Sequence, residues 1–283
     1  MPDEYTDRFF AVNGCRLHVQ DWGNAAVPPL LFVHGLTQQS HAFDGAARRL
    51  RGRFRCLALD VRGRGDSEWA APESYTLAQY AQDVLALLDA LGIAATDYVG
   101  TSMGGLTAMA IARKAPQRLR RVVLNDIGPE LAEAGLQRIA ASVGERSGSF
   151  ASVDDFIERG LLPYFYWLAA RPREQVRELA RWGLREQPDG TWRVKYDPAV
   201  QGGAASDPET RRKAAAFLWA GFRAFAGPLL LIRGAESDLL ARETVIAMQE
   251  AQPGLRVVEV PGVSHAPTLD EPEAAAALEA FFA

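Results

Sequence analysis

Cysteine is scarce in this sequence, with only Cys15 and Cys56 among 283 residues. Both lie in short apolar runs, where a free thiol behaves as a small hydrophobic side chain. Two such residues indicate neither a disulfide framework nor a cysteine metal site. We therefore expect a fold that is stabilised by a hydrophobic core, without disulfides.

Long hydrophobic runs and targeting signals are also lacking. No apolar stretch approaches the roughly 18 residues that a membrane-spanning helix needs. The first residues, from Met1 to Asp7, are acidic and contain no apolar core of the kind found in secretory signals. The sequence thus predicts a cytoplasmic protein without a membrane partner.

An excess of basic residues is absent as well. The chain has 31 Lys and Arg against 35 Asp and Glu, which gives a net charge of −4. Nucleic-acid-binding domains usually carry a basic excess, so a nucleic-acid partner is not expected. A composition of 48% hydrophobic and 23% charged residues is ordinary for a globular protein with a sizeable core. The expected partner is a small molecule, and the sequence does not indicate an oligomeric state.

What the chain does contain is an alternation of short apolar runs with helical patterns, which is typical of βαβ units and a mostly parallel sheet. Asn13-Gly14 joins the first two runs and is a hairpin signal, so the sheet should begin antiparallel. The candidate strands are Phe9–Asn13, Arg16–Trp22, Leu30–His34, Arg55–Asp60, Asp97–Gly100, Arg121–Asp126, Leu229–Arg233 and Arg256–Val260.

The clearest helix pattern covers Leu77–Leu91, where apolar residues recur at steps of three and four. Thr76 and Gln79 predict a capping box at its start, and Gly92 predicts its end. Further helices are expected from Met103 through Ala112, ending before Pro116, and from Pro272 to Phe281.

The segment 128–225 interrupts this alternation, because it shows helical patterns and many aromatic residues but no clear strand. We interpret it as a helical cap inserted into a core domain formed by residues 1–127 and 226–283. Most of its aromatic side chains should pack the cap onto the core, and a minority should line a ligand cavity.

The motif Gly100-Thr-Ser102-Met-Gly104 lies directly after a predicted strand and before a predicted helix. A serine hydroxyl is a weak nucleophile, and a tight strand-to-helix turn exposes it to a base. The two glycines remove the Cβ atoms that would collide in such a turn. Ser102 is the expected nucleophile, and the Met103 amide at the helix start is an expected oxyanion donor.

A second oxyanion donor is expected in the loop that follows the third strand, which begins His34-Gly35-Leu36. The glycine allows the backbone to approach the nucleophile, so the Leu36 amide is the candidate. We expect the side chain of His34 to hold this loop in place and not to transfer protons.

The general base can be chosen by elimination, since the chain has four histidines. His18 belongs to the first hairpin, and His34 and His41 belong to the oxyanion loop and the helix after it. Only His265 follows the last strand, in a loop that can reach the carboxyl edge of the sheet, where ligands of open α/β sheets bind.

Three carboxylates compete to orient His265. We expect Asp238, which follows the strand Leu229–Arg233 and gives the chain order Ser, Asp, His. Asp126, at the end of the preceding strand, could also reach the imidazole, and Glu236 is a further alternative. The loop that begins at Asp60 is interpreted as a structural turn.

Taken together, these motifs resemble the α/β-hydrolase superfamily, and they spread over almost the whole chain in the order of that family. The resemblance implies a mostly parallel eight-stranded sheet with helices on both faces, a cap after the sixth strand and a serine triad. Within the superfamily the chain is similar to bacterial esterases, lactonases and carbon–carbon hydrolases. Serine at position 102 argues against dehalogenases and epoxide hydrolases, which use aspartate there. The motifs are His34-Gly35, Asp60 to Ser67, Gly100 to Gly105, Gly234 to Asp238 and His265 to Pro272.

The expected activity is hydrolysis of an ester or lactone of a hydrophobic small molecule through an acyl-enzyme, without a metal or organic cofactor. Hydrolysis of a carbon–carbon bond in a ring-cleavage product is the alternative. It would need a cationic group in the cap, for which Arg159, Arg171 and Arg181 are available. A third possibility is a ligand-binding protein on a hydrolase fold that has no activity.

Overall fold

The structure is a computed structural model that describes residues 4–146, 148–200 and 207–283. It has an eight-stranded sheet in the order β1-β2-β4-β3-β5-β6-β9-β10. The β1–β2 and β2–β4 pairs are antiparallel, and all later pairs are parallel. The strands are β1 Thr6–Val12, β2 Cys15–Asp21, β3 Pro29–Val33, β4 Arg55–Leu59, β5 Thr96–Thr101, β6 Leu119–Asn125, β9 Leu229–Gly234 and β10 Arg256–Val260.

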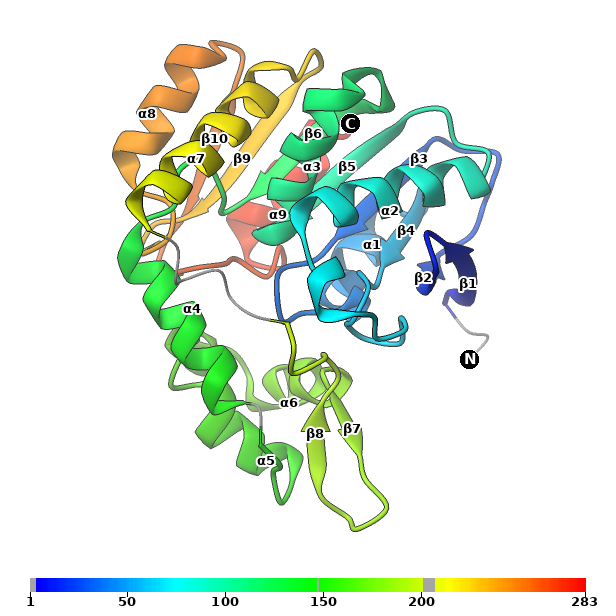
Figure 1. Cartoon of the computed structure of the whole chain (residues 1–283), viewed down its shortest axis with the longest axis vertical. Coiled ribbons are helices and arrows are strands. Elements are labelled where there is room, and N and C mark those ends of the chain that lie inside the picture. The colour runs from blue at the N-terminus through cyan, green and yellow to red at the C-terminus, as the bar shows by residue number, and fades with distance from the viewer. Residues whose placement is uncertain (1–3, 147, 201–206) are drawn as a thin grey trace.

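Helices cover both faces of this sheet (Figure 1). The sequence therefore predicted the fold class correctly, and the strand and helix limits differ from the expected ones by only a few residues. The helices are α1 Asp44–Leu50, α2 Leu77–Ala90, α3 Met103–Lys114, α4 Glu133–Glu145, α5 Val153–Phe156, α6 Arg173–Trp182, α7 Pro208–Arg223, α8 Arg242–Ala251 and α9 Pro272–Phe281. Short helical turns are η1 Ser40–Phe43, η2 Pro72–Ser74, η3 Pro116–Arg118, η4 Ile157–Leu161 and η5 Tyr166–Ala170.

Local sequence signals explain several of these limits. Asn13 and Gly14 both have positive φ angles, as a tight turn between β1 and β2 requires. The Thr76 hydroxyl accepts a hydrogen bond from the Gln79 amide and caps α2. The other half of the expected capping box is not made, because the Gln79 side chain donates to Asp83 instead.

The core forms two layers, because alternate residues of each strand point to opposite faces. Leu31 and Val33 of β3 pack with α2, α3, α7 and α8 on one face. Leu30 and Phe32 of the same strand pack with α1 and α9 on the other. This second apolar cluster continues into the segment that follows β6, including Phe156, Trp167 and Leu184.

The segment after β6 differs from a purely helical cap in two respects. It contains a short antiparallel hairpin of β7 (Leu184–Glu186) and β8 (Trp192–Val194), which projects from the molecule in Figure 1. The turn signal Asp189-Gly190 marks this hairpin in the sequence. Moreover, α7 packs on α3, so closely that a Cβ atom on Gly221 would lie 2.1 Å from the Met109 carbonyl oxygen. The part of the insertion that stands off the sheet thus runs from α4 to β8 (Figure 1), and α7 belongs to the helical layer of the core.

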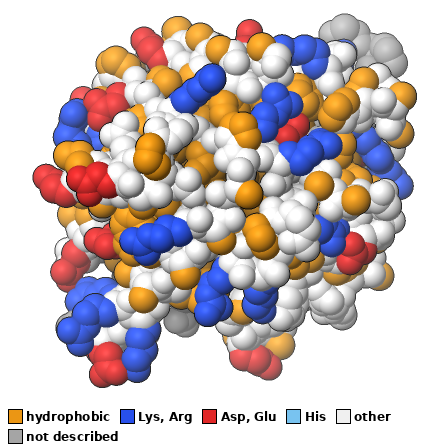
Figure 2. All heavy atoms as spheres, turned by 90° about the horizontal axis from the view of Figure 1, so that it is seen from above, with side chains coloured by type: hydrophobic (Ala, Val, Ile, Leu, Met, Phe, Trp, Pro, Cys, Tyr) orange, Lys and Arg blue, Asp and Glu red, His pale blue; other side chains and the backbone are white. Residues whose placement is uncertain are grey.

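The surface carries charges of both signs. On the face shown in Figure 2, basic, acidic and apolar side chains are interspersed. Within the described residues no helix is long and apolar enough to cross a membrane.

Candidate active site

Ser102 occupies the turn between β5 and α3. Its φ angle of 50° is rare for a residue with a side chain and projects the hydroxyl from the end of the sheet. The flanking glycines are sterically required: a Cβ atom on Gly100 would lie 2.6 Å from the Gly104 carbonyl carbon, and one on Gly104 would lie 1.9 Å from the Val33 oxygen. The two glycines of the motif thus lie where β3, β5 and α3 pack closely against one another.

His265 reaches Ser102 from the loop after β10. Its Nε2 atom lies 2.9 Å from the Ser102 Oγ atom, although the two residues are 163 positions apart in the chain. The His265 side chain is 7% exposed, so bulk water has little access to this pair. The structure therefore brings together the serine and the histidine that the sequence selected.

The carboxylate beside His265 is Asp126, and the expectation of Asp238 is wrong in this respect. Asp126 Oδ2 lies 2.7 Å from His265 Nδ1. Asp126 is fully buried and also accepts hydrogen bonds from the Gly234 amide and the Ser237 hydroxyl. Because a carboxylate only accepts hydrogen bonds, this contact places the proton on Nδ1 and leaves Nε2 free to accept the serine proton.

Asp238 has a different partner. Both of its oxygens accept hydrogen bonds from Arg138 of α4, from Nε at 2.6 Å and from Nη2 at 2.7 Å. Burial raises the pKa of the Asp238 carboxyl, but the Arg138 hydrogen bonds and charge outweigh it, so this pKa lies below its ordinary value. Glu236, the other alternative, accepts a hydrogen bond from the Tyr166 hydroxyl.

The sequence could not separate Asp126 from Asp238, because both follow parallel strands that end at the same edge. Either residue also satisfies the chain order Ser, Asp, His that favoured Asp238. The difference lies in the contact between β6 and β9: the Asp126 amide donates to the Ile232 carbonyl, which sets the Asp126 side chain beside the β9 loop.

The loop after β3 approaches Ser102 as expected. A Cβ atom on Gly35 would lie 3.5 Å from the Ser102 Cβ atom, so the Gly35–Leu36 backbone passes close to the hydroxyl. His34 fixes this loop: Nδ1 lies 2.7 Å from the Gly35 carbonyl oxygen, and Nε2 accepts from the Val61 amide at 3.0 Å. Complete burial lowers the pKa of His34 to about 4, which keeps it neutral and suits a structural role.

The comparisons with known proteins decide the family. Residues 28–272 match the family model of the alpha/beta hydrolase fold. The chain belongs to the α/β-hydrolase family.

Among the relatives of this hydrolase is a 3-hydroxybutyrate-oligomer hydrolase from Cupriavidus necator, 39% identical, with 94% of this chain and 92% of the relative covered. A 2-(acetamidomethylene)succinate hydrolase from Mesorhizobium japonicum is 30% identical, with 93% and 90% covered. A solved structure of an α/β hydrolase from Novosphingobium aromaticivorans superposes with a TM-score of 0.88 at 35% identity, covering 99% and 98% of the two chains. The chain is therefore an enzyme of the hydrolase class, similar to esterases.

A cavity of about 50 Å³ lies at Ser102 and His265 of this hydrolase. A second cavity of about 90 Å³ adjoins it, since Thr37, Gln38, Arg146, Phe165 and Ala266 line both. The insertion provides much of the lining, including the aromatic side chains of Phe156, Phe165 and Trp167. The site is thus enclosed between the sheet edge and the insertion.

Arg146 is the basic residue of the insertion that lines both cavities. The three arginines considered from the sequence lie elsewhere: Arg159 pairs with Asp155, Arg181 stacks on Trp192, and Arg171 lines a separate surface depression. The signal for Arg146 was its spacing on one face of α4, together with Ile139 and Ser142, at steps of three and four residues.

Arg64, in the loop interpreted as a structural turn, contacts both residues that carry the expected oxyanion donors. Its side chain is fully buried, its Nε atom donates to the Leu36 carbonyl at 3.0 Å, and Nη2 lies 3.6 Å from the Met103 sulfur. The carboxylate of Asp60 accepts from the amides of Ser40 and Asp66, as a structural turn requires. Through Arg64 and Asp60, this turn therefore holds the loop after β3 in position beside Ser102.

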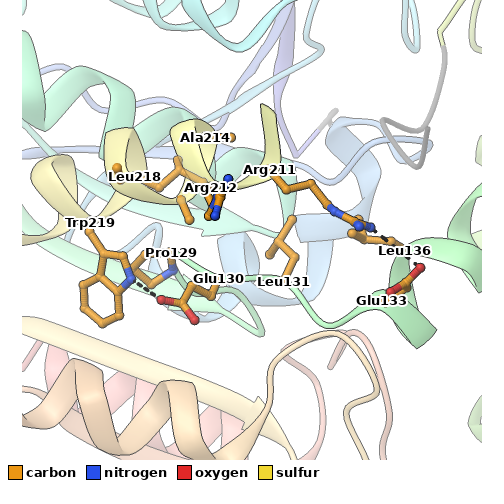
Figure 3. A pocket seen from close by; sticks show the side chains of 12 residues that line it. Pro129, Glu130, Leu131, Glu133, Leu136, Arg211, Arg212, Ala214, Leu218 and Trp219 are labelled. Carbon is orange, nitrogen blue, oxygen red and sulfur yellow. Dashed lines mark hydrogen bonds and ion pairs between the residues drawn. The ribbon is translucent and has the colours of Figure 1, made fainter. Parts of the chain in front are cut away.

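A larger hollow of about 720 Å³ lies away from Ser102, between the chain after β6 and α7 (Figure 3). Both of its acidic side chains have a partner in the hollow. Trp219 Nε1 donates to Glu130 at 2.6 Å, and Arg211 lies 3.7 Å from Glu133. Because these carboxylates already have partners, the hollow is a weaker candidate for an active site than the Ser102 cavity.

Proposed function

We propose that this hydrolase cleaves carboxylic esters or lactones of small molecules through an acyl-enzyme. The observation that carries the proposal is the continuous contact from Ser102 Oγ to His265 Nε2 and from His265 Nδ1 to Asp126. In this proposal Ser102 is the nucleophile, His265 the general base and Asp126 the carboxylate that orients it.

In the first half-reaction, His265 Nε2 takes the Ser102 proton as Oγ attacks the ester carbonyl. The carbonyl oxygen becomes an oxyanion, which the Leu36 and Met103 amides stabilise by hydrogen bonds. In another serine hydrolase, loss of one such donor costs roughly 3–4 kcal/mol of transition-state stabilisation. His265 then gives its proton to the leaving alcohol, and Asp126 stabilises the transient imidazolium.

In the second half-reaction, water replaces the alcohol. His265 takes a proton from this water, the water oxygen attacks the acyl carbonyl, and Ser102 leaves with the proton returned from His265. The products are an acid and an alcohol, and the enzyme is restored. Each step uses side chains and amides of this chain, and none requires a metal or organic cofactor.

Esters of short hydroxy acids are the first substrates to test. The relative from Cupriavidus necator acts on 3-hydroxybutyrate oligomers, whose units are joined by ester bonds, and it is 39% identical over almost the whole chain. The two small adjoining cavities suit a short acyl chain better than a long one.

Carbon–carbon bond hydrolysis with the same triad is the second candidate, and Arg146 favours it. That reaction needs a cationic group near the nucleophile for the substrate carboxylate, and Arg146 lines the Ser102 cavity. An assay of a coloured ring-cleavage product beside a 4-nitrophenyl ester separates the two activities, because only a carbon–carbon hydrolase bleaches the former.

The test of the nucleophile is covalent labelling. A fluorophosphonate probe should add one adduct per chain, located on Ser102 by peptide mass spectrometry. Ser102→Ala should fold normally, take no label and lose ester turnover by several orders of magnitude. A folded wild-type protein that takes no label and hydrolyses no ester would refute the proposal and would leave the non-catalytic ligand-binding function.

A further inference from the structure

Arg146 places a buried positive charge in the active-site cavity. Its side chain, at the C-terminal end of α4, belongs to a residue that is 4% exposed. Nε donates to the Ser142 carbonyl at 3.0 Å, and Nη2 donates to the hydroxyls of Thr37 and Ser142. These acceptors are all neutral, and no ion pair within the described ranges includes Arg146. A buried charge without a counter-ion is costly to a folded protein.

A second arginine on the same helix shows the contrast. Arg138, two turns earlier, is held by both oxygens of Asp238. No carboxylate of the described residues pairs with Arg146, and burial is the main cause that lowers its pKa. A guanidinium nevertheless stays protonated under ordinary conditions. Among the described residues, Arg138 is thus paired with a carboxylate, whereas Arg146 has only neutral hydrogen-bond acceptors and the ring of Phe165, whose centroid lies 5.3 Å from its guanidinium carbon.

Two more hydrogen-bond donors in the same cavity lack an acceptor. The Tyr196 hydroxyl and the Trp167 Nε1 atom are buried, and neither has a hydrogen-bond partner among the described residues. Both residues line the second cavity together with Arg146. Buried polar atoms are almost always paired in folded proteins, so unpaired donors that share a cavity with an uncompensated cation point to a missing acceptor.

We infer that the second cavity is a carboxylate subsite, in which Arg146, Tyr196 and Trp167 hold an anionic group of the substrate while its ester carbonyl lies at Ser102. The inference rests on the proposed function and narrows it to short esters that carry a carboxylate. The planar guanidinium is suited to a carboxylate, because charge-assisted hydrogen bonds of this kind are short and directional.

A purely structural role for Arg146 makes a different prediction. Its bond to the Ser142 carbonyl also caps α4, and a helix C-terminus favours a cation. Capping explains the position of Arg146 but not the unpaired donors of Tyr196 and Trp167. If capping were its only role, substitution would lower stability and would affect charged and neutral substrates equally.

The experiment compares two substrates that differ only in charge. One is 3-(butanoyloxy)butanoate, and the other is its primary amide, which has the same scissile ester and nearly the same shape. A second pair, 4-nitrophenyl hemiglutarate and its amide, places the carboxylate on the acyl side. The measured quantity is the ratio of kcat/KM for the acid to that for the amide. In at least one pair the wild-type ratio should exceed about ten.

Three variants and one matched control test the residues. Arg146→Met should lower that ratio about 10- to 100-fold, and Arg146→Lys should restore part of it. Tyr196→Phe removes a hydroxyl that has no hydrogen-bond partner among the described residues, so it should lower the ratio severalfold without lowering the unfolding midpoint. The double variant Arg138→Met/Asp238→Asn, which removes the neighbouring arginine together with its counter-ion and leaves the net charge unchanged, should keep the wild-type ratio.

Calorimetric titration of Ser102→Ala protein with the acid and the amide separates binding from catalysis. Tighter binding of the acid, weakened by Arg146→Met, supports the subsite even if the proposed chemistry fails. Equal binding of the acid and the amide would overturn the inference. So would kcat/KM ratios of acid to amide that are near one in both substrate pairs and that Arg146→Met and Tyr196→Phe leave unchanged. A folded wild-type protein without labelling at Ser102 and without any ester turnover would instead overturn the proposed function.

Discussion

The direction of single side chains decides the chemistry of this site, as the choice of carboxylate beside His265 shows. Asp126 and Asp238 leave neighbouring strands at the same edge, yet only Asp126 contacts the imidazole, and Asp238 is bound to Arg138. The distinction depends on side-chain direction, which follows from the positive φ angle of Asp126 and from the donors of the β9 loop. These two aspartates therefore form a natural pair for substitution.

Asp126→Asn should lower kcat by about 10³- to 10⁴-fold, since an amide nitrogen facing Nδ1 would stabilise the wrong imidazole tautomer, as in another serine triad. Asp238→Asn keeps the size of its side chain and does not touch His265, so kcat should fall by less than about tenfold. Steady-state kinetics on a 4-nitrophenyl ester measures both. A larger loss in Asp238→Asn than in Asp126→Asn would contradict the assignment.

His34 should make the protein less stable in mild acid. Its pKa in the folded state is about 4, because complete burial disfavours the imidazolium, whereas the unfolded pKa is about 6.5. Between these values the unfolded state binds more protons, so the free energy of unfolding falls as the pH falls through this window, by on the order of 3 kcal/mol.

The measurement for His34 is the urea midpoint of unfolding from pH 7 to pH 4, for wild type and His34→Gln. The variant lacks the titrating group, so its urea midpoint should fall less steeply between pH 7 and pH 4. At pH 7 its midpoint should be lower than that of the wild type. His18 works in the opposite sense, because contacts with Asp60 and Asp7 raise its pKa against the effect of burial. Comparison with the variant removes that contribution, and identical slopes would refute the prediction.

At the scale of elements, close contact between β3, β5 and α3 sets the position of Ser102. Gly104→Ala would place a methyl group 1.9 Å from the Val33 carbonyl oxygen, which forces α3 away from the sheet. The expected loss of stability is about 3 kcal/mol or more. In α4, apart from the neighbouring residues and the backbone of the helix itself, no atom of the described residues lies within 4 Å of a Cβ atom on Gly144. Gly144→Ala should therefore stabilise the protein by about 0.5–1 kcal/mol through helix propensity.

Urea unfolding followed by circular dichroism compares these two glycine variants. Gly104→Ala should lower the free energy of unfolding and Gly144→Ala should raise it. This difference tests whether close packing excludes a side chain at position 104. A folded Gly104→Ala protein with wild-type stability would show that the β3–α3 contact is looser than the structure indicates.

The oxyanion loop depends on another element, the turn that carries Arg64. Arg64→Met removes the hydrogen bond to the Leu36 carbonyl, so the Leu36 amide should lose its fixed direction. We expect kcat to fall about 10- to 100-fold with a smaller change in KM, because the donor acts mainly on the oxyanion. A change confined to KM would contradict this role.

The elements were largely predictable from the sequence, whereas their mutual contacts were not. Strand and helix periodicity identified all eight strands of the main sheet and the helices at Leu77, Met103 and Pro272, because these patterns depend on nearby residues. The β7–β8 hairpin was missed, since its strands have only three residues each. The packing of α7 on α3, the partner of His265 and the burial of Arg146 depend on contacts between distant residues, which local patterns do not encode.

At the scale of the whole molecule, one apolar cluster joins the sheet to the insertion. His41, in the helical turn η1, also stacks on Trp182 of α6 with ring centroids 3.6 Å apart. We therefore expect one cooperative unfolding transition. Tryptophan fluorescence, which reports on Trp167, Trp182 and Trp192 of the insertion among others, should give the same urea midpoint as circular dichroism. Two separate midpoints would show that the insertion unfolds independently.

The shared cluster also constrains how this enzyme can change its specificity in evolution. Residues such as Phe156, Trp167 and Leu168 line the second cavity and belong to the same cluster as the sheet. A substitution that admits a new substrate therefore also disturbs the packing that keeps the protein folded. New specificities should arise together with compensating changes in α1 or α9, whose side chains belong to the same cluster.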